Sequence, residues 1–211
     1  MENITRGAIR AGWEILKKRP WFIVFVPLGA NVLVYLLSSV LDEIAKTGSF
    51  ASLVTSVANI AAYTLLNMGI TAFFLKAYDD PTKVVFTDLW HPQPFWNYFA
   101  ASVIAFILTL VGLLLFIVPG IIIAITLAFW SYLVIDRELG PIEALKESAR
   151  LTRGRRWQLF VFFLLLVIFN ILGFLALIVG VFITIPVSTL ASVHVFRALQ
   201  QESGALTPVS A

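Results

Sequence analysis

The side chains that could carry chemistry are few and scattered. They comprise two pairs of adjacent carboxylates and two histidines, namely Asp42-Glu43, Asp79-Asp80, His91 and His194. Acid–base catalysis requires such groups to converge with a third group in one pocket, and two isolated histidines do not form a metal site. We therefore expect solvated loop carboxylates and hydrogen-bonded histidines. We predict no catalytic residues, no enzyme activity, no metal and no cofactor.

The composition is that of a membrane protein. Of the 211 residues, 60% are hydrophobic and 13% are charged, whereas soluble domains are about a quarter charged. The mean hydropathy is +0.93. The chain has no cysteine, which excludes disulfides and cysteine-ligated metals. The basic residues lie at the ends of apolar runs, so we attribute the pI of about 9.3 to membrane topology and expect no nucleic-acid partner.

Four long apolar tracts predict an all-α protein with six transmembrane helices. A helix needs about 20 residues to cross a hydrocarbon core of ~30 Å, and the two longest tracts are broken at Pro119-Gly120 and at Gly180. We expect one membrane domain over residues 1–199, followed by a flexible tail over 200–211. The predicted spans are about 21–41, 53–76, 98–118, 120–135, 157–178 and 180–198.

The basic residues also predict an orientation. All fifteen lysines and arginines except Lys46 fall at the two termini or in the connections 76–97 and 136–156. The positive-inside rule therefore places both termini in the cytoplasm. Trp21, Trp96 and Trp157 stand at the starts of spans one, three and five, where amphipathic rings prefer to lie at the membrane interface. We interpret them as interface anchors.

An internal repeat relates the three pairs of spans. A shift of 61 residues places Trp96 on Trp157 and Gly112 on Gly173, and a shift of 136 places Trp21 on Trp157. Each pseudo-repeat then consists of an amphipathic segment, a tryptophan and a helical pair. Interfacial helices are expected at about 3–18 and 141–153, with their apolar faces toward the membrane. These faces contain Ile4, Ala8, Ala11 and Ile15 in the first helix and Ile142, Leu145, Ala149 and Thr152 in the second.

The run DRELGPIEALKESARLTRGRRW, from Asp136 to Trp157, resembles an uncharacterised family of prokaryotic membrane proteins. That family is related to the membrane domain that precedes the catalytic part of some glycerophosphodiester phosphodiesterases. The resemblance implies a fold and a multi-pass protein of the prokaryotic cytoplasmic membrane, and it implies no activity. The matching positions are Asp136, Gly140-Pro141, Glu143-Ala144-Leu145-Lys146, Ser148, Arg150, Gly154-Arg155-Arg156 and Trp157.

Two further sets of residues are candidates for binding. No Asp, Glu, Lys or Arg lies centrally in a predicted span, which argues against an active transporter. Asparagines within spans predict either hydrogen bonds between helices or a polar path for a substrate, and they are Asn31, Asn59, Asn67 and Asn170. Basic residues beside the spans predict two compatible roles, a topology signal and contact with anionic headgroups. These residues are Lys17, Lys18, Arg19, Arg153, Arg155 and Arg156.

We therefore expect a non-enzymatic integral membrane protein. Its helical bundle and cytoplasmic interfacial layer would bind lipid, in particular anionic lipid, or another membrane protein. The alternative is a passive permease or transporter component for a small uncharged or lipid-like solute, because repeat architectures are common among transporters. A continuous polar cavity from one face to the other would favour that alternative.

Overall fold

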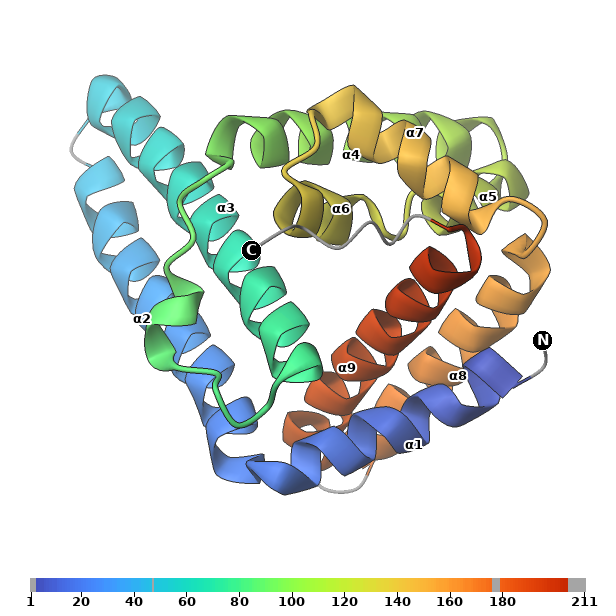
Figure 1. Cartoon of the computed structure of the whole chain (residues 1–211). Helices are drawn as coiled ribbons and strands as arrows, with labels where there is room; N and C mark the ends of the chain where they lie inside the picture. The colour runs from blue at the N-terminus through green and yellow to red at the C-terminus, as the bar shows by residue number, and fades with distance from the viewer. Residues whose placement is uncertain (1–2, 47, 176–178, 205–211) are drawn as a thin grey trace.

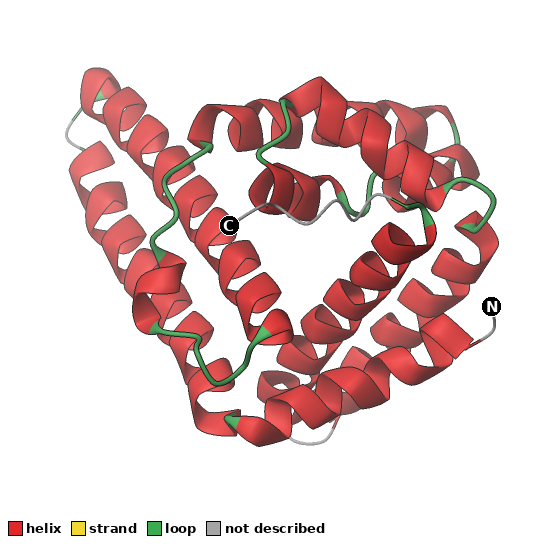
Figure 2. Ribbon diagram, in the orientation of Figure 1, coloured by secondary structure: helices red, strands yellow, loops and turns green. Residues whose placement is uncertain are grey.

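The computed structural model describes residues 3–46, 48–175 and 179–204, and in this part of the chain all regular structure is helical (Figure 2). Within these described residues, six stretches are long and apolar enough to cross a membrane. The helical form follows from the solvent, because backbone groups in a bilayer must bond within their own segment. The prediction of an all-α membrane protein with six spans is confirmed at this level.

Nine α-helices and one 3-10 helix occupy the described residues. Three hairpins form the sides of a triangle in Figure 1: α2 with α3, α4 with the consecutive helices α5 and α6, and α8 with α9. Helix α1 packs against α9, and α7 lies beside α4. The elements are α1 (Asn3–Lys18), α2 (Pro20–Ala45), α3 (Ser49–Asp79), η1 (Phe86–Leu89), α4 (Phe95–Leu115), α5 (Ile117–Thr126), α6 (Trp130–Arg137), α7 (Pro141–Thr152), α8 (Arg156–Leu175) and α9 (Val179–Glu202).

The core lies where the hairpins meet. Its largest fully buried side chains include Phe73 of α3, Phe162 of α8 and Phe196 of α9. Phe196 contacts Phe129, which lies between α5 and α6, with 5.9 Å between the ring centroids. Offset aromatic pairs of this kind contribute about 0.5–1.5 kcal/mol beyond their buried area.

The first predicted helix break is displaced from Pro119-Gly120. The chain reverses at Phe116, whose backbone is extended (φ −162°, ψ 149°), and α5 begins at the next residue. Pro119 lies in the first turn of α5, where a missing N–H costs no helical hydrogen bond. Gly120 serves close packing: a Cβ there would overlap Leu113 of α4.

Gly180 is likewise the second residue of α9 and does not form the break. A Cβ on Gly180 would overlap the Gly173 carbonyl of α8, so its small size is needed where the two helices approach. The connection itself, residues 176–178, lies outside the described residues.

The predicted span 120–135 lies within the apolar stretch Ile117–Arg137, but the helix in it is interrupted at 127–129, between α5 and α6. The interruption leaves two backbone groups without helical partners, the Thr126 carbonyl and the Phe129 N–H. Both are bonded by Ser148 of α7: its hydroxyl donates to the carbonyl at 2.9 Å and accepts from the N–H at 3.2 Å. Thr152 also donates to the Thr126 carbonyl at 3.3 Å, and both hydroxyl residues are fully buried.

The apolar faces predicted for the two amphipathic helices differ from the buried faces. In α1, Ala8, Gly12 and Leu16 are buried and pack against α9, where a Cβ on Gly12 would lie 2.6 Å from the Val187 carbonyl oxygen. That face is therefore occupied by protein, and Ile4 lies outside the described side chains. In α7, Ile142 is 57% exposed, and the buried residues are Ala144, Leu145, Ser148, Leu151 and Thr152.

The helix at the C-terminal end also extends further than predicted. Helix α9 continues to Glu202, so residues 200–202 are helical and do not belong to a tail. Gln200 is fully buried, and its amide donates to a carboxylate oxygen of Asp136 on α6 at 3.2 Å. This contact explains the extension. Residues 205–211 lie outside the described residues.

Replacing Ser148 with alanine should destabilise the protein. The substitution leaves the buried Phe129 N–H without a partner, at a cost of about 1–3 kcal/mol. Unfolding in a nonionic detergent measures the loss. The control is Ser56→Ala. The Ser56 hydroxyl is exposed and donates only to the Ser52 carbonyl of its own helix. If both variants unfolded like the wild type, α7 would not hold the interrupted span.

Candidate functional site

Helix α7 presents opposite faces of different chemistry. Ser148 and Thr152 are buried against the interrupted span. Lys146 and Arg150, four residues apart, share the outer face with Arg153, the residue that caps the helix. Residues at spacings of three and four lie on one side of an α-helix, so the bonds of the buried face direct the three cations outward.

Local sequence explains why α7 begins and ends where it does. Pro141 occupies the first helical position, and the Glu143 carboxylate accepts the Gly140 N–H at 3.4 Å. After the helix, Gly154 adopts φ +78°, a left-handed conformation that glycine tolerates best. The chain therefore reverses at once, and Arg156 and Trp157 open α8 beside the end of α7.

A basic pocket of about 750 Å³ lies at this α7–α8 junction. It is open to the surface, and the described residues that line it include four cations but no carboxylate, histidine or hydroxyl group. This basic pocket is lined by Lys146, Ala149, Arg150, Arg153, Gly154, Arg156 and Trp157.

The charge of the basic pocket is largely uncompensated. The Glu147 carboxylate accepts two bonds of 2.7 Å from the Arg150 guanidinium, and these bonds lower the pKa of Glu147 below its ordinary value. Glu147 is therefore ionised at neutral pH and offsets Arg150. Within the part of the chain that the structure describes, Lys146, Arg153 and Arg156 form no ion pair. The arrangement suits an anion.

The structure brings together only two of the six cations that the sequence suggested. Arg153 and Arg156 line the basic pocket, whereas Arg155 pairs with Glu202 of α9. Arg19 donates to the carbonyls of Thr82 and Val84 at 3.2 and 3.0 Å, so it fixes the connection after α3.

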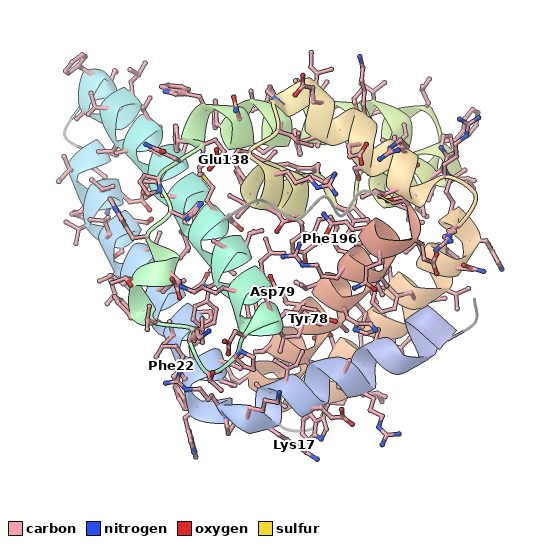
Figure 3. All side chains as sticks on the ribbon, in the orientation of Figure 1. Lys17, Phe22, Tyr78, Asp79, Glu138 and Phe196 are labelled. Carbon is pink, nitrogen blue, oxygen red and sulfur yellow. The ribbon has the colours of Figure 1, made fainter. Side chains whose placement is uncertain are left out.

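Lys17 and Lys18 end α1 on the opposite side of the molecule from the α7–α8 junction (Figures 1 and 3). The Lys17 ammonium lies over the Trp13 ring, 5.6 Å from its centroid. The sequence predicted lipid contact at the interfacial helix 141–153 but did not single out Lys146 and Arg150 as contact residues. The spacing of 146, 150 and 153 on one helical face was the signal that could have found them.

The three predicted anchors occupy equivalent positions. Trp21, Trp96 and Trp157 are each the second residue of a helix, α2, α4 and α8 respectively. Their exposed fractions are 75%, 76% and 74%. An exposed indole at the start of an apolar helix matches the position that tryptophan prefers at a membrane interface.

The intramembrane asparagines divide into two kinds. Asn59 bonds Asp42 of α2 at 3.3 Å, and Asn170 bonds Ser188 of α9 at 2.8 Å, so these two connect neighbouring helices. Asn31 and Asn67 donate only to carbonyls of their own helices, at 2.8 and 2.7 Å, and Asn170 also donates to Leu166 O of its own helix at 2.7 Å. The four amide nitrogens are thus all bonded, whereas the buried Oδ1 atoms of Asn59 and Asn170 have no partner among the described residues.

The carboxylates and histidines that the sequence singled out lie in separate contacts. Asp79 was expected to be solvated, but it pairs with the Arg197 guanidinium at 2.6 Å. His194 Nδ1 lies 2.8 Å from the Tyr78 hydroxyl (Figure 3 labels Tyr78 and Asp79). In the described ranges, no three potential metal ligands lie together.

These features define a multi-pass helical membrane protein whose α7–α8 junction forms a basic pocket. The chain belongs to the family described as "Protein of unknown function (DUF975)", which it matches over residues 96–203. The match runs from α4 to α9 and includes the whole basic pocket. No curated protein and no solved structure matches the chain. Membership of an uncharacterised family is thus confirmed, and the relation to glycerophosphodiester phosphodiesterases stays a prediction.

Proposed function

We propose that this chain is a non-enzymatic membrane protein that binds anionic lipid at the basic pocket. One observation carries the proposal: Lys146, Arg153 and Arg156 gather without carboxylate partners around a cavity next to the exposed ring of Trp157. A guanidinium group can donate two parallel N–H···O bonds to one phosphate group. A cluster of cations at the membrane surface attracts anionic headgroups by about 1 kcal/mol for each basic residue.

The proposal includes an orientation and a location. The asymmetry of lysine and arginine supports cytoplasmic termini, which put the basic pocket at the cytoplasmic face. The resemblance of the α6–α8 segment supports the cytoplasmic membrane of a prokaryote. Matching positions of Trp21, Trp96 and Trp157 support three pseudo-repeats that share one interface level.

A passive permease or transporter component is the second candidate. One observation favours it: a pocket of about 490 Å³ between α3, α4 and α6 is lined in part by Asn59, Asn67 and Ser102. The Asn67 amide and the Ser102 hydroxyl, however, already donate to carbonyls of their own helices. Because those donors are satisfied, the pocket offers a polar solute few free donors, and its one buried acceptor without a partner among the described residues is Asn59 Oδ1.

Replacing Arg153 and Arg156 with glutamine should weaken anionic-lipid binding. Two lost cations correspond to about 2 kcal/mol, or roughly 30-fold in affinity. A bound lipid raises the unfolding temperature of the folded state, so the readout is thermal unfolding in nonionic detergent with phosphatidylglycerol or phosphatidylcholine. The wild type should be stabilised by phosphatidylglycerol, less so at high salt, and the double variant should not.

The matched control for this experiment is Lys17→Gln with Lys18→Gln. It removes the same net charge from the exposed end of α1, on the other side of the molecule. The control should keep its stabilisation by phosphatidylglycerol. Equal losses in the two double variants would show that overall charge attracts the lipid, and the basic pocket would then have to be abandoned as the site.

The proposed orientation can be tested by labelling introduced cysteines in this cysteine-free chain. Gly48 has extended backbone and no neighbour within 4 Å of a Cβ, and Gln201 is exposed, so both accept cysteine. In intact cells a membrane-impermeant maleimide should label Gly48→Cys. It should label Gln201→Cys only after the membrane is permeabilised. Equal labelling of both without permeabilisation would contradict cytoplasmic termini.

A further inference from the structure

An apolar groove of about 460 Å³ lies beside the basic pocket, between α5 and α8. One wall is formed by Val118, Ile121, Ile122 and Ile125 of α5. Ile121 and Ile122 are 37% and 42% exposed, so a ligand can reach this wall. On its other side, α5 is close-packed on α4, where a Cβ on Gly112 would lie 3.0 Å from Gly120 Cα.

The apolar groove and the basic pocket share two residues. Arg156 and Trp157 line both cavities. The Trp157 ring stacks on Phe160, with 5.3 Å between the centroids, and Phe160 continues the groove wall along α8. The two cavities therefore meet at the first turn of α8, where a cationic surface passes directly into an apolar one.

We infer that the two cavities together seat one molecule of an anionic glycerophospholipid, with its phosphate in the basic pocket and one acyl chain in the apolar groove. The inference rests on the proposed function and adds the ligand class and its pose. Charge complementarity places the phosphate among Lys146, Arg153 and Arg156. The acyl chain then lies between Trp157 and Phe160 of α8 and the apolar wall of α5.

The size of the groove favours an acyl chain over a partner helix. A helix with its side chains is about 10–12 Å wide, so one turn of 5.4 Å fills roughly 500 Å³. The whole groove has about 460 Å³, close to the volume of one such turn, so only a short helical segment would fit within it. A single acyl chain needs no hydrogen-bond partners and can bend along the Ile and Phe side chains, so it suits an apolar wall.

The experiment distinguishes binding of the lipid headgroup from binding of its acyl chain by means of two probes. Binding of dioctanoyl phosphatidylglycerol and of glycerol 3-phosphate is measured on the full chain in nonionic detergent. Ile122→Trp fills the groove and should weaken lipid binding about tenfold, because the chain loses on the order of ten carbon contacts. It should leave glycerol 3-phosphate binding unchanged. The wild type should bind dioctanoyl more tightly than dihexanoyl phosphatidylglycerol, a comparison that requires no variant.

The control variant is Leu110→Trp, because Leu110 of α4 is 41% exposed and lies outside the groove. It should bind both probes like the wild type. If Ile122→Trp and the shorter chains leave lipid affinity unchanged while Arg153→Gln with Arg156→Gln lowers it, the groove is not a chain site and the proposed function stands. If the arginine variant also binds lipid normally, both ideas fail. Glycerol 3-phosphate bound as tightly as the lipid would identify a free phosphate site and overturn the inference.

Discussion

Inside a bilayer, a backbone N–H or C=O without a protein partner has no water to bond with, and it costs several kcal/mol. The fourth span meets this constraint at its interruption, where the Thr126 carbonyl and the Phe129 N–H are released from the helix. Ser148 serves both groups, and Thr152 adds a second bond to the carbonyl. These bonds fix α7 against the span. They also decide that the opposite face of α7, with its cations, is the one that faces outward.

A second polar contact fixes the end of the span from which α7 departs. The Arg197 guanidinium of α9 pairs with Asp136 of α6 at 2.7 Å and with Asp79 of α3 at 2.6 Å, so one residue joins the second helix of each hairpin. Gln200 bonds the same Asp136 oxygen. A partly buried pair of this kind adds little net stability, because desolvation offsets attraction. Its effect is on arrangement: α6 ends at a defined place, and α7 starts four residues later.

The sequence predicted the spans and missed the interruption for a physical reason. The length of an apolar tract and the positions of the charges can be read from local composition. They were enough to predict six apolar helices and a tryptophan at the start of three of them. The segment from Thr126 to Phe129 contains neither proline nor glycine. Its break is held by Ser148, 22 residues from Thr126. A pairing of that range is invisible to periodicity. Conversely, Pro119-Gly120 looks like a turn but occupies a helix, because a first turn tolerates proline and close packing requires glycine.

The basic pocket, too, was only partly predictable from the sequence. Arg153 and Arg156 were predictable as a dense cationic cluster beside Trp157. The internal roles of Arg155 and Arg19 were not, because their partners, Glu202 and the carbonyls after α3, lie far along the chain. Sequence spacing could reveal which cations share a helical face. It could not reveal which of them keep an unpaired charge.

The binding of one anionic lipid at the α7–α8 junction is tested most directly by native mass spectrometry of the wild-type protein extracted from its membrane in a mild nonionic detergent. We expect a population that carries a single phospholipid with an anionic headgroup, retained at detergent concentrations that remove the bulk lipid. Protein that carries no lipid, or that carries zwitterionic and anionic lipids in the proportions of the membrane, would contradict a specific anionic-lipid site.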